Sequence, residues 1–345
     1  MEMEKMNNEQ MEQEQTVAER KSAESSFSKL GFMFLIGTAV IYAVQYLAAW
    51  GVKAWKPEWL ADPTISLMVT ILPMYLVGIP ALVYFVKKIP GTAPAQHSMK
   101  KGHLVLAFIM CYAIMYGSNL IGTVITTVIG LIKGSAVDNA ILNVATSANM
   151  AVTFIYMVIC APFIEEYVFR KLIVDRTARF GQGVAVVVSG VMFGLFHGNL
   201  SQFVYATTLG MFFAFIYVKT GKLKYSIILH MVINFMGAIV SVLVLKGIHM
   251  DEYMQVVATG DVDALMAFVM NYLPGWIAYL FYLLFVMIVF VTGVILLIVF
   301  HKRFVLEKGE VSIPKGKRFA TIFLNFGMLV YSLFWIGMMI VQLIQ

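Results

Sequence analysis

Five ionisable side chains lie within long apolar stretches of this sequence, where few other charges occur. Glu165, Glu166 and Arg170 fall in one stretch, and His197 and His230 fall in later ones. A charge at the centre of a membrane helix costs roughly 2.5–3.5 kcal/mol on insertion scales, and such residues tend to face the bundle interior and to pair. We therefore expect the five groups to meet at one polar site suited to acid–base chemistry. The competing interpretation places the charges at a helix end, where they reach the lipid headgroups.

The spacing of the two glutamates gives them different expected roles. Glu165 and Glu166 are adjacent, so their side chains point about 100° apart on a helix. Glu166 and Arg170 stand at positions i and i+4 with the acid first, which is the favourable order for an ion pair. We expect this pair to be structural and to fix the rotation of its helix. Glu165 is then free to face a cavity and to act as a general base.

Two further polar side chains share one face of a later helix. His230 and Asn234 are four residues apart, so they project from the same side of that helix. Their ordinary role would be a hydrogen bond between helices. Their functional role would be a pair of donors aimed at a developing oxyanion. His197 is likewise either a packing residue or a member of the site, and Asn199 just beyond it is a candidate positioning residue.

The composition indicates that these residues lie within a bundle of membrane-spanning segments. Apolar residues make up 60% of the 345, charged residues 13%, and the mean hydropathy is +0.83. A soluble domain has about 45–50% apolar residues and about 25% charged residues. The apolar runs are continuous rather than alternating, which excludes a barrel and predicts an all-α polytopic bundle. The net charge of +6 lies in short loops, so we expect no nucleic-acid partner. Cys111 and Cys160 are expected to be small core residues.

Nine apolar runs approach the length that spans a hydrocarbon core about 30 Å thick. Lys and Arg are concentrated in alternate connections, so the positive-inside rule places the N-terminus in the cytoplasm and the C-terminus outside. An odd number of spans satisfies that orientation. The fifth and sixth runs are short and nearly abut at His197. The nine runs are 30–50, 64–86, 104–132, 150–174, 183–199, 201–219, 225–246, 276–300 and 320–344.

The chain divides into five expected segments. Residues 1–28 are rich in Glu, Gln and Lys and are predicted to form a disordered cytoplasmic tail. Residues 29–149 hold the first spans, and residues 150–246 hold the spans that carry the chemistry. Residues 247–275 form an outer loop with a short helix expected on the membrane surface. Residues 276–345 hold the last spans.

Three motifs in order resemble the signature of a known family. The chain carries Glu-Glu-x-x-x-Arg starting at Glu165, Phe-x-x-x-His ending at His197, and His-x-x-x-Asn starting at His230. Together they resemble the motifs of the CPBP (Abi) intramembrane protease family. That family includes type II CAAX prenyl endopeptidases and many bacterial proteins linked to bacteriocin maturation or self-immunity. The resemblance covers about residues 150–240 and has no departure at the motif positions.

The resemblance implies roles for four residues. Glu165 would activate the attacking water, with His197 helping to hold it, and His230 and Asn234 would stabilise the oxyanion of a peptide bond. The family is often described as metal-dependent, and Glu165, His197 and His230 could hold a zinc ion with one open position for water. The sequence has no His-Glu-x-x-His pair, and the same residues suffice for a glutamate mechanism. We therefore favour the metal-free alternative.

The function expected from the sequence is that of an intramembrane endopeptidase in a bacterial cell membrane. Its substrate would be a membrane-associated peptide or protein, in contact with the lipid bilayer. The alternative is a non-catalytic protein of the same fold that binds a regulatory protein partner or confers bacteriocin self-immunity. A proton-coupled transporter would also use intramembrane Glu and His residues. It is disfavoured because the polar groups lie in one block and no inverted repeat is evident.

Overall fold

The computed structural model describes residues 2–135, 137 and 140–344, and these residues form helices joined by short connections. No strand occurs among them, which confirms the all-α prediction. Eight helices in this part of the chain are long and apolar enough to cross a membrane, so the chain is an integral multi-pass membrane protein. They are Glu14–Trp55, Pro63–Lys87, Lys101–Lys133, Met150–Phe180, Leu200–Thr220, Leu223–Gly247, Leu273–Val299 and Phe326–Ile344.

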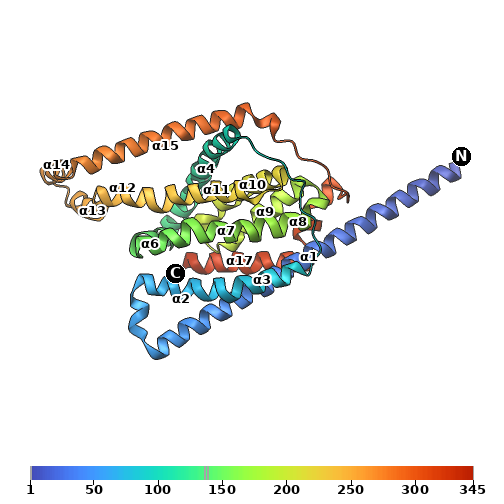
Figure 1. Cartoon of the computed structure of the whole chain (residues 1–345), viewed down its shortest axis with the longest axis horizontal. Coiled ribbons are helices and arrows are strands. Elements are labelled where there is room, and N and C mark those ends of the chain that lie inside the picture. Colours follow the sequence, from blue (N-terminus) through green and yellow to red (C-terminus); the bar gives the residue numbers. More distant parts are fainter. Residues whose placement is uncertain (1, 136, 138–139, 345) are drawn as a thin grey trace.

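Some of these spans are single helices and others consist of consecutive helical pieces (Figure 1). The single helices are α1 (Glu2–Trp55), α4 (Lys101–Lys133), α10 (Leu200–Thr220), α15 (Leu273–Val299) and α17 (Phe326–Ile344). The composite spans are built from α2 (Pro63–Pro73) with α3 (Ile79–Lys87), from α6 (Met150–Thr153) with α7 (Ala161–Glu165) and α8 (Ile173–Thr177), and from α11 (Leu223–Phe235) with α12 (Ser241–Gly247).

Eight of the nine predicted runs form helices long enough to span a membrane among the described residues. The fifth predicted run, 183–199, forms α9 (Gln182–Phe196), which has only 15 residues. At about 1.5 Å per residue it is roughly 22 Å long, short of the membrane core. Gly198 has a φ of 63°, and the chain turns there into α10. The start of α1 and the end of α17 nevertheless lie toward opposite ends of the molecule (Figure 1). This follows because α9 adds one short pass to the eight longer ones. Which end faces the cytoplasm stays a prediction.

The segment predicted to be a disordered tail is helical in the structure. Apart from Met1, which lies outside the described residues, the segment 1–28 belongs to α1, a helix of 54 residues. Glu, Gln, Lys, Met and Ala are strong helix formers, and the helix of the first span continues through them. Its last turns before the span are packed, because Ala23 and Phe27 are both 0% exposed. The amino-terminal turns of α1 project beyond the bundle (Figure 1).

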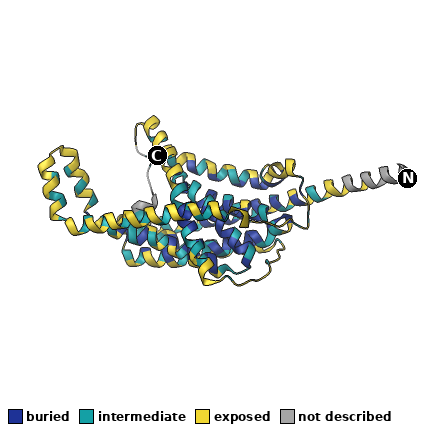
Figure 2. Cartoon of the chain, turned by 90° about the horizontal axis from the view of Figure 1, so that it is seen from above, coloured by how far each residue is buried: buried dark blue, intermediate teal, exposed yellow. Residues whose placement is uncertain are grey.

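The helices that carry the chemistry occupy the middle of the bundle. α7, α9, α10 and α11 are flanked by α1, α3 and α17 on one side and by α4 and α15 on the other (Figure 1). Buried residues concentrate in this middle layer (Figure 2). α9 and α10 cross closely because glycines replace larger side chains there. A Cβ atom on Gly190 would lie 2.7 Å from the carbonyl oxygen of Thr207.

The outer loop contains two helices rather than the single one expected. α13 (Met250–Thr259) and α14 (Val262–Asn271) have no buried residue. They pack against each other through Tyr253 and Phe268, whose ring centroids are 6.2 Å apart. The pair projects from the bundle at the far ends of α12 and α15 (Figures 1 and 2). The loop is therefore a helical hairpin held away from the central helices.

An extended connection at the opposite end ties the central helices together. Val311 donates its backbone N–H to the carbonyl of Arg179 at 3.0 Å. Lys219 donates to the Glu307 carboxylate at 2.7 Å, and this hydrogen bond lowers the pKa of that exposed carboxyl. The Glu19 carboxylate of α1 accepts from the backbone N–H of Ser312 at 3.0 Å. These bonds hold the ends of α1, α8, α9 and α10 in register around the polar site.

Candidate active site

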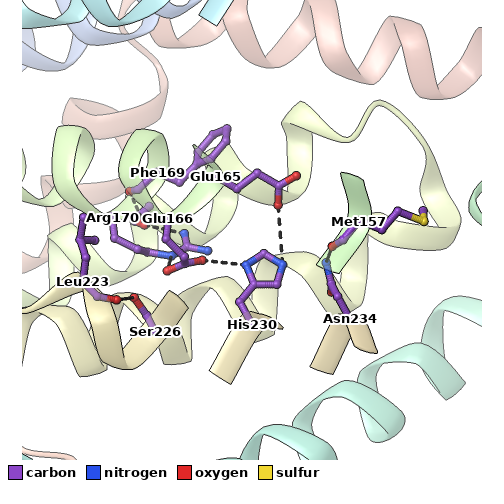
Figure 3. A network of polar contacts seen from close by, with 10 residues as sticks. Met157, Glu165, Glu166, Phe169, Arg170, Leu223, Ser226, His230 and Asn234 are labelled. Atoms are coloured by element: carbon purple, nitrogen blue, oxygen red, sulfur yellow. Dashed lines mark hydrogen bonds and ion pairs between the residues drawn. The ribbon is translucent and has the colours of Figure 1, made fainter. Parts of the chain in front are cut away.

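The fold brings Glu165, Glu166, Arg170 and His230 into one buried network (Figure 3). The first three come from the span Met150–Phe180, and His230 comes from α11. Pro162 lies within that first span and leaves one backbone carbonyl of the preceding turn without its usual donor. The helix responds with wide π-helical turns before and after α7, a geometry that is frequent at functional sites.

The expected ion pair between Glu166 and Arg170 is present. The Nε atom of Arg170 lies 3.0 Å from Oε2 of Glu166, and both side chains are 0% exposed. Their i, i+4 spacing on one helix places the two groups side by side. The aromatic ring of Phe193 also covers the guanidinium, with Cζ of Arg170 4.5 Å from the ring centroid. The positive charge is therefore enclosed by a carboxylate and an aromatic face.

His230 is held by the second oxygen of the same carboxylate. Its Nδ1 lies 3.0 Å from Oε1 of Glu166, and since an ionised carboxylate can only accept, Nδ1 carries the donated hydrogen. This contact directs the other ring nitrogen toward Glu165. The Nε2 atom of His230 is 3.7 Å from Oε2 of Glu165 (Figure 3). That separation is too long for a direct hydrogen bond but suits two groups that bind one water or substrate atom between them.

Glu165 is the accessible member of the carboxylate pair. Its side chain is 29% exposed, whereas that of Glu166 is fully buried. Tyr75 and Tyr156 lie close enough to interact electrostatically with its carboxylate, and their rings contact each other at 5.9 Å between centroids. Sequence reasoning had not singled out these tyrosines. Glu165 thus has a reachable carboxylate in a largely aromatic surround.

His197 lies near this network without a hydrogen bond to Glu165 or His230 among the described residues. Its Nδ1 is 2.8 Å from the carbonyl oxygen of Phe193, so Nδ1 donates and Nε2 is left for another partner. Electrostatic interaction with both Glu165 and His230 places the ring in their vicinity. Asn199 donates from Nδ2 to the carbonyl of His197 at 3.1 Å, as expected of a residue that positions this turn.

Asn234 has a backbone partner that its sequence position did not predict. It shares a helix face with His230, as expected, but its Nδ2 donates to the carbonyl oxygen of Met157 at 2.8 Å (Figure 3). Met157 belongs to the π-helical turn Phe154–Cys160, where a wide turn loosens the usual backbone pairing. Asn234 therefore holds the segment that leads to Glu165. Its amide keeps one further N–H for a second acceptor.

Ser189 is a member of the network that sequence reasoning missed. It lies on α9, is 0% exposed, and accepts from Nη1 of Arg170 at 3.0 Å. Its own hydroxyl donates to the carbonyl of Phe169 at 2.8 Å. A single serine in an apolar helix usually bonds to its own helix, so no local pattern distinguishes one that reaches across to another helix.

A metal ion does not fit the residues in the positions they occupy. Two imidazoles and one carboxylate from His197, His230 and Glu165 are chemically suited to zinc. However, the described residues contain no group of three or more His, Cys, Asp or Glu side chains arranged to hold a metal ion. We therefore derive no step of the chemistry through a metal.

A membrane-embedded helical bundle that buries a carboxylate–histidine network is the class of protein defined by this fold and geometry. Residues 147–236 match the family model described as "Type II CAAX prenyl endopeptidase Rce1-like". This segment contains every site residue predicted from the sequence. Over this segment the chain is therefore similar to the CPBP family that its three motifs resemble.

Two curated bacterial proteins are similar to the chain. YdiL of Bacillus subtilis (strain 168), named as an inferred membrane peptidase, is 29% identical over 124 residues, which are 35% of this chain and 49% of that protein. The chain thus spans about half the length of this relative. The "Membrane-embedded CAAX protease MroQ" of Staphylococcus aureus (strain USA300) is 24% identical over 173 residues, 47% of this chain and 69% of that protein. No solved structure matches the chain.

Proposed function

We propose that this protein is an intramembrane endopeptidase that hydrolyses a peptide bond in a membrane-associated peptide or protein. The observation that carries the proposal is that the two adjacent glutamates make different contacts. Glu166 binds Arg170 and His230 with its two oxygens. Glu165 remains accessible and faces Nε2 of His230 at 3.7 Å. The names of the two bacterial relatives support peptidase activity.

In this mechanism Glu165 is the general base. Its carboxylate takes a proton from a water molecule as the water oxygen bonds to the carbonyl carbon of the scissile peptide. The hydrogen bond from Nδ1 of His197 to Phe193 leaves Nε2 free. Nε2 accepts a hydrogen bond from the second O–H of the water and so orients the nucleophile. A positioned general base contributes typically about 10²- to 10⁴-fold to a rate.

His230 supplies the charge that stabilises the oxyanion. Carboxylates stand against both of its ring nitrogens, Glu166 at 3.0 Å and Glu165 at 3.7 Å. In the proposed step both ring nitrogens carry a hydrogen, and Nε2–H donates to the developing oxyanion, with the second amide N–H of Asn234 as a further donor. The carbon–nitrogen bond then breaks, and the protonated Glu165 gives its proton to the departing amine. Water is consumed, and a carboxylic acid and an amine are formed.

The test compares cells that carry the wild-type protein with cells that carry Glu165→Gln or Glu165→Ala. Mass spectrometry of membrane-associated peptides and of protein termini would show a product that depends on the wild-type carboxylate. The purified full-length protein should then cleave the identified precursor in vesicles, and the Glu165→Gln protein should not. Identical peptide and terminus profiles in all strains, with equal protein levels, would contradict the proposal.

A non-catalytic, partner-binding function is the second candidate, including the self-immunity role open from the sequence. The feature that favours it is the projecting hairpin α13–α14, which exposes Met254, Met266 and Met270. Under this hypothesis, deletion of the gene would produce a phenotype that Glu165→Gln complements fully. Substitutions on the hairpin would instead reproduce the deletion.

A further inference from the structure

The guanidinium of Arg170 uses an unusual subset of its donors. Nε donates to Oε2 of Glu166 at 3.0 Å and Nη1 donates to Ser189 at 3.0 Å. Nη2 is buried and has no hydrogen-bond partner among the described residues. In an arginine, Nη2–H runs parallel to Nε–H, and these two donors form the side-on fork that binds both oxygens of a carboxylate. Arg170 therefore binds Glu166 through Nε alone, although Nε and Nη2 could bind the carboxylate together.

The single contact from Arg170 matters because it leaves the second oxygen of Glu166 available to His230. Oε1 accepts from Nδ1 of His230 at 3.0 Å. If Nη2 of Arg170 took this oxygen, the carboxylate would turn toward the guanidinium and the hydrogen bond to His230 would weaken. The hydrogen bond to Oε1 orients the imidazole of His230 and directs its Nε2 toward Glu165. This orientation therefore depends on Arg170 leaving Oε1 free.

Ser189 supplies the restraint. Its oxygen accepts from Nη1 of Arg170, and its own hydrogen is committed to the carbonyl of Phe169 at 2.8 Å, so a lone pair is fixed toward the guanidinium. Gly210 of the neighbouring helix α10 lies against the guanidinium, because a Cβ atom added there would stand 3.5 Å from Nη2 of Arg170, in van der Waals contact. The serine thus anchors the guanidinium on the side opposite to the unused fork.

We propose that Ser189 is a positioning residue that holds Arg170 in a single contact with Glu166 and so reserves the second carboxylate oxygen for His230. This inference rests on the proposed function for its effect on catalysis. Its effect on the histidine hydrogen bond does not depend on any activity. Loss of the hydroxyl lets the guanidinium rotate onto both oxygens of Glu166, and the Nδ1–H of His230 then loses its acceptor.

The experiment follows the ring nitrogens of His230 by NMR, using isotope-labelled histidine in the full-length protein in nanodiscs. The signals of His230 are those that disappear in His230→Gln. In the wild type, Nδ1–H should show the downfield proton shift of a hydrogen bond to a carboxylate. Ser189→Ala should move this resonance upfield or lose it to exchange with water, and Ser189→Thr, which keeps the hydroxyl, should restore it. If Ser189→Ala does not fold, Ser189→Cys replaces it, since a thiol is a weak acceptor.

The matched control is Ser118→Ala. Ser118 is a buried serine on α4 whose hydroxyl donates within its own helix, to the carbonyls of Ile114 at 2.5 Å and Met115 at 3.2 Å, so its loss should leave the His230 signals unchanged. An unchanged His230 resonance in Ser189→Ala, or in Ser189→Cys where that variant is used, would overturn the inference. An equal change in Ser118→Ala would also do so.

Kinetics separate this inference from the proposed function. With a cleaved substrate in hand, Ser189→Ala should lower kcat by about 10- to 100-fold, the usual effect of a misplaced catalytic group, and should leave KM within about twofold. A rise in KM at constant kcat would overturn the inference. If the wild type cleaves no peptide, the proposed function fails, but the NMR result still decides whether Ser189 sets the partner of His230.

Discussion

Replacement of Arg170 by alanine should lower the free energy of unfolding by about 3–5 kcal/mol, the usual result of removing one partner of a buried ion pair. Arg170 and Glu166 are both 0% exposed. The variant leaves the Glu166 carboxylate without its cation, leaves Ser189 without the Nη1 donor, and removes the guanidinium that covers Phe193. At 1.4 kcal/mol per factor of ten, the folded-to-unfolded ratio falls by roughly 10²- to 10³-fold or more.

The assay is SDS titration of the purified protein in mild detergent, with unfolding followed by tryptophan fluorescence. Arg179→Ala is the matched control, because this exposed guanidinium has no carboxylate partner here: it donates to the hydroxyl of Ser26 at 2.8 Å and lies 4.6 Å from the ring centroid of Phe180. Surface changes of this kind stay within about 0.5 kcal/mol. The double variant Glu166→Gln with Arg170→Met should recover most of the loss, since it leaves no unpaired charge. The reasoning is refuted if Arg170→Ala unfolds at the same SDS concentration as the wild type.

Four further predictions follow from the same geometry. Glu165→Gln should abolish cleavage yet change stability by less than about 1 kcal/mol, because the side chain is 29% exposed and its contact with Nε2 of His230 is long, at 3.7 Å; a strong loss of stability in SDS titration would make Glu165 structural. Asn234→Ala should lower kcat by about 10²- to 10³-fold if its free N–H faces the oxyanion, and an unchanged kcat in the cleavage assay would limit it to holding Met157. A strong zinc chelator such as phenanthroline should leave cleavage unchanged, and inactivation that added zinc reverses would establish a metal mechanism. Gly190→Ala should destabilise the fold by about 1–3 kcal/mol in the same titration, since its Cβ would lie 2.7 Å from Thr207 O; wild-type stability would show that α9 and α10 can separate without loss.

The two carboxylates illustrate how adjacent residues acquire opposite roles. Glu166 is fully enclosed and uses both oxygens within the protein, so its negative charge stabilises the arrangement of α7, α9 and α11. Glu165 points away by about a quarter of a helix turn and keeps its oxygens for an external group. A substrate that approaches the site would therefore meet one accessible acid with a histidine behind it, rather than two equivalent acids.

The sequence by itself determined the class of fold and those relations between polar residues that lie within one helix. Continuous apolar runs admit only helices in a membrane, so the all-α bundle followed from composition. The contact between Glu166 and Arg170 and the shared face of His230 and Asn234 followed from the helical period, because both are relations within one helix. Local spacing is sufficient for such relations.

Only the tertiary structure decided which helices exchange hydrogen bonds. The bond from His230 to Glu166, the reach of Ser189 to Arg170 and that of Asn234 to Met157 all join different helices. The same holds for the helical state of residues 2–28, which is supported by packing of Ala23 and Phe27 in the core, and for the short length of α9. Crossing positions between helices depend on the shapes of both surfaces, and a periodic pattern in one segment carries no information about its partner.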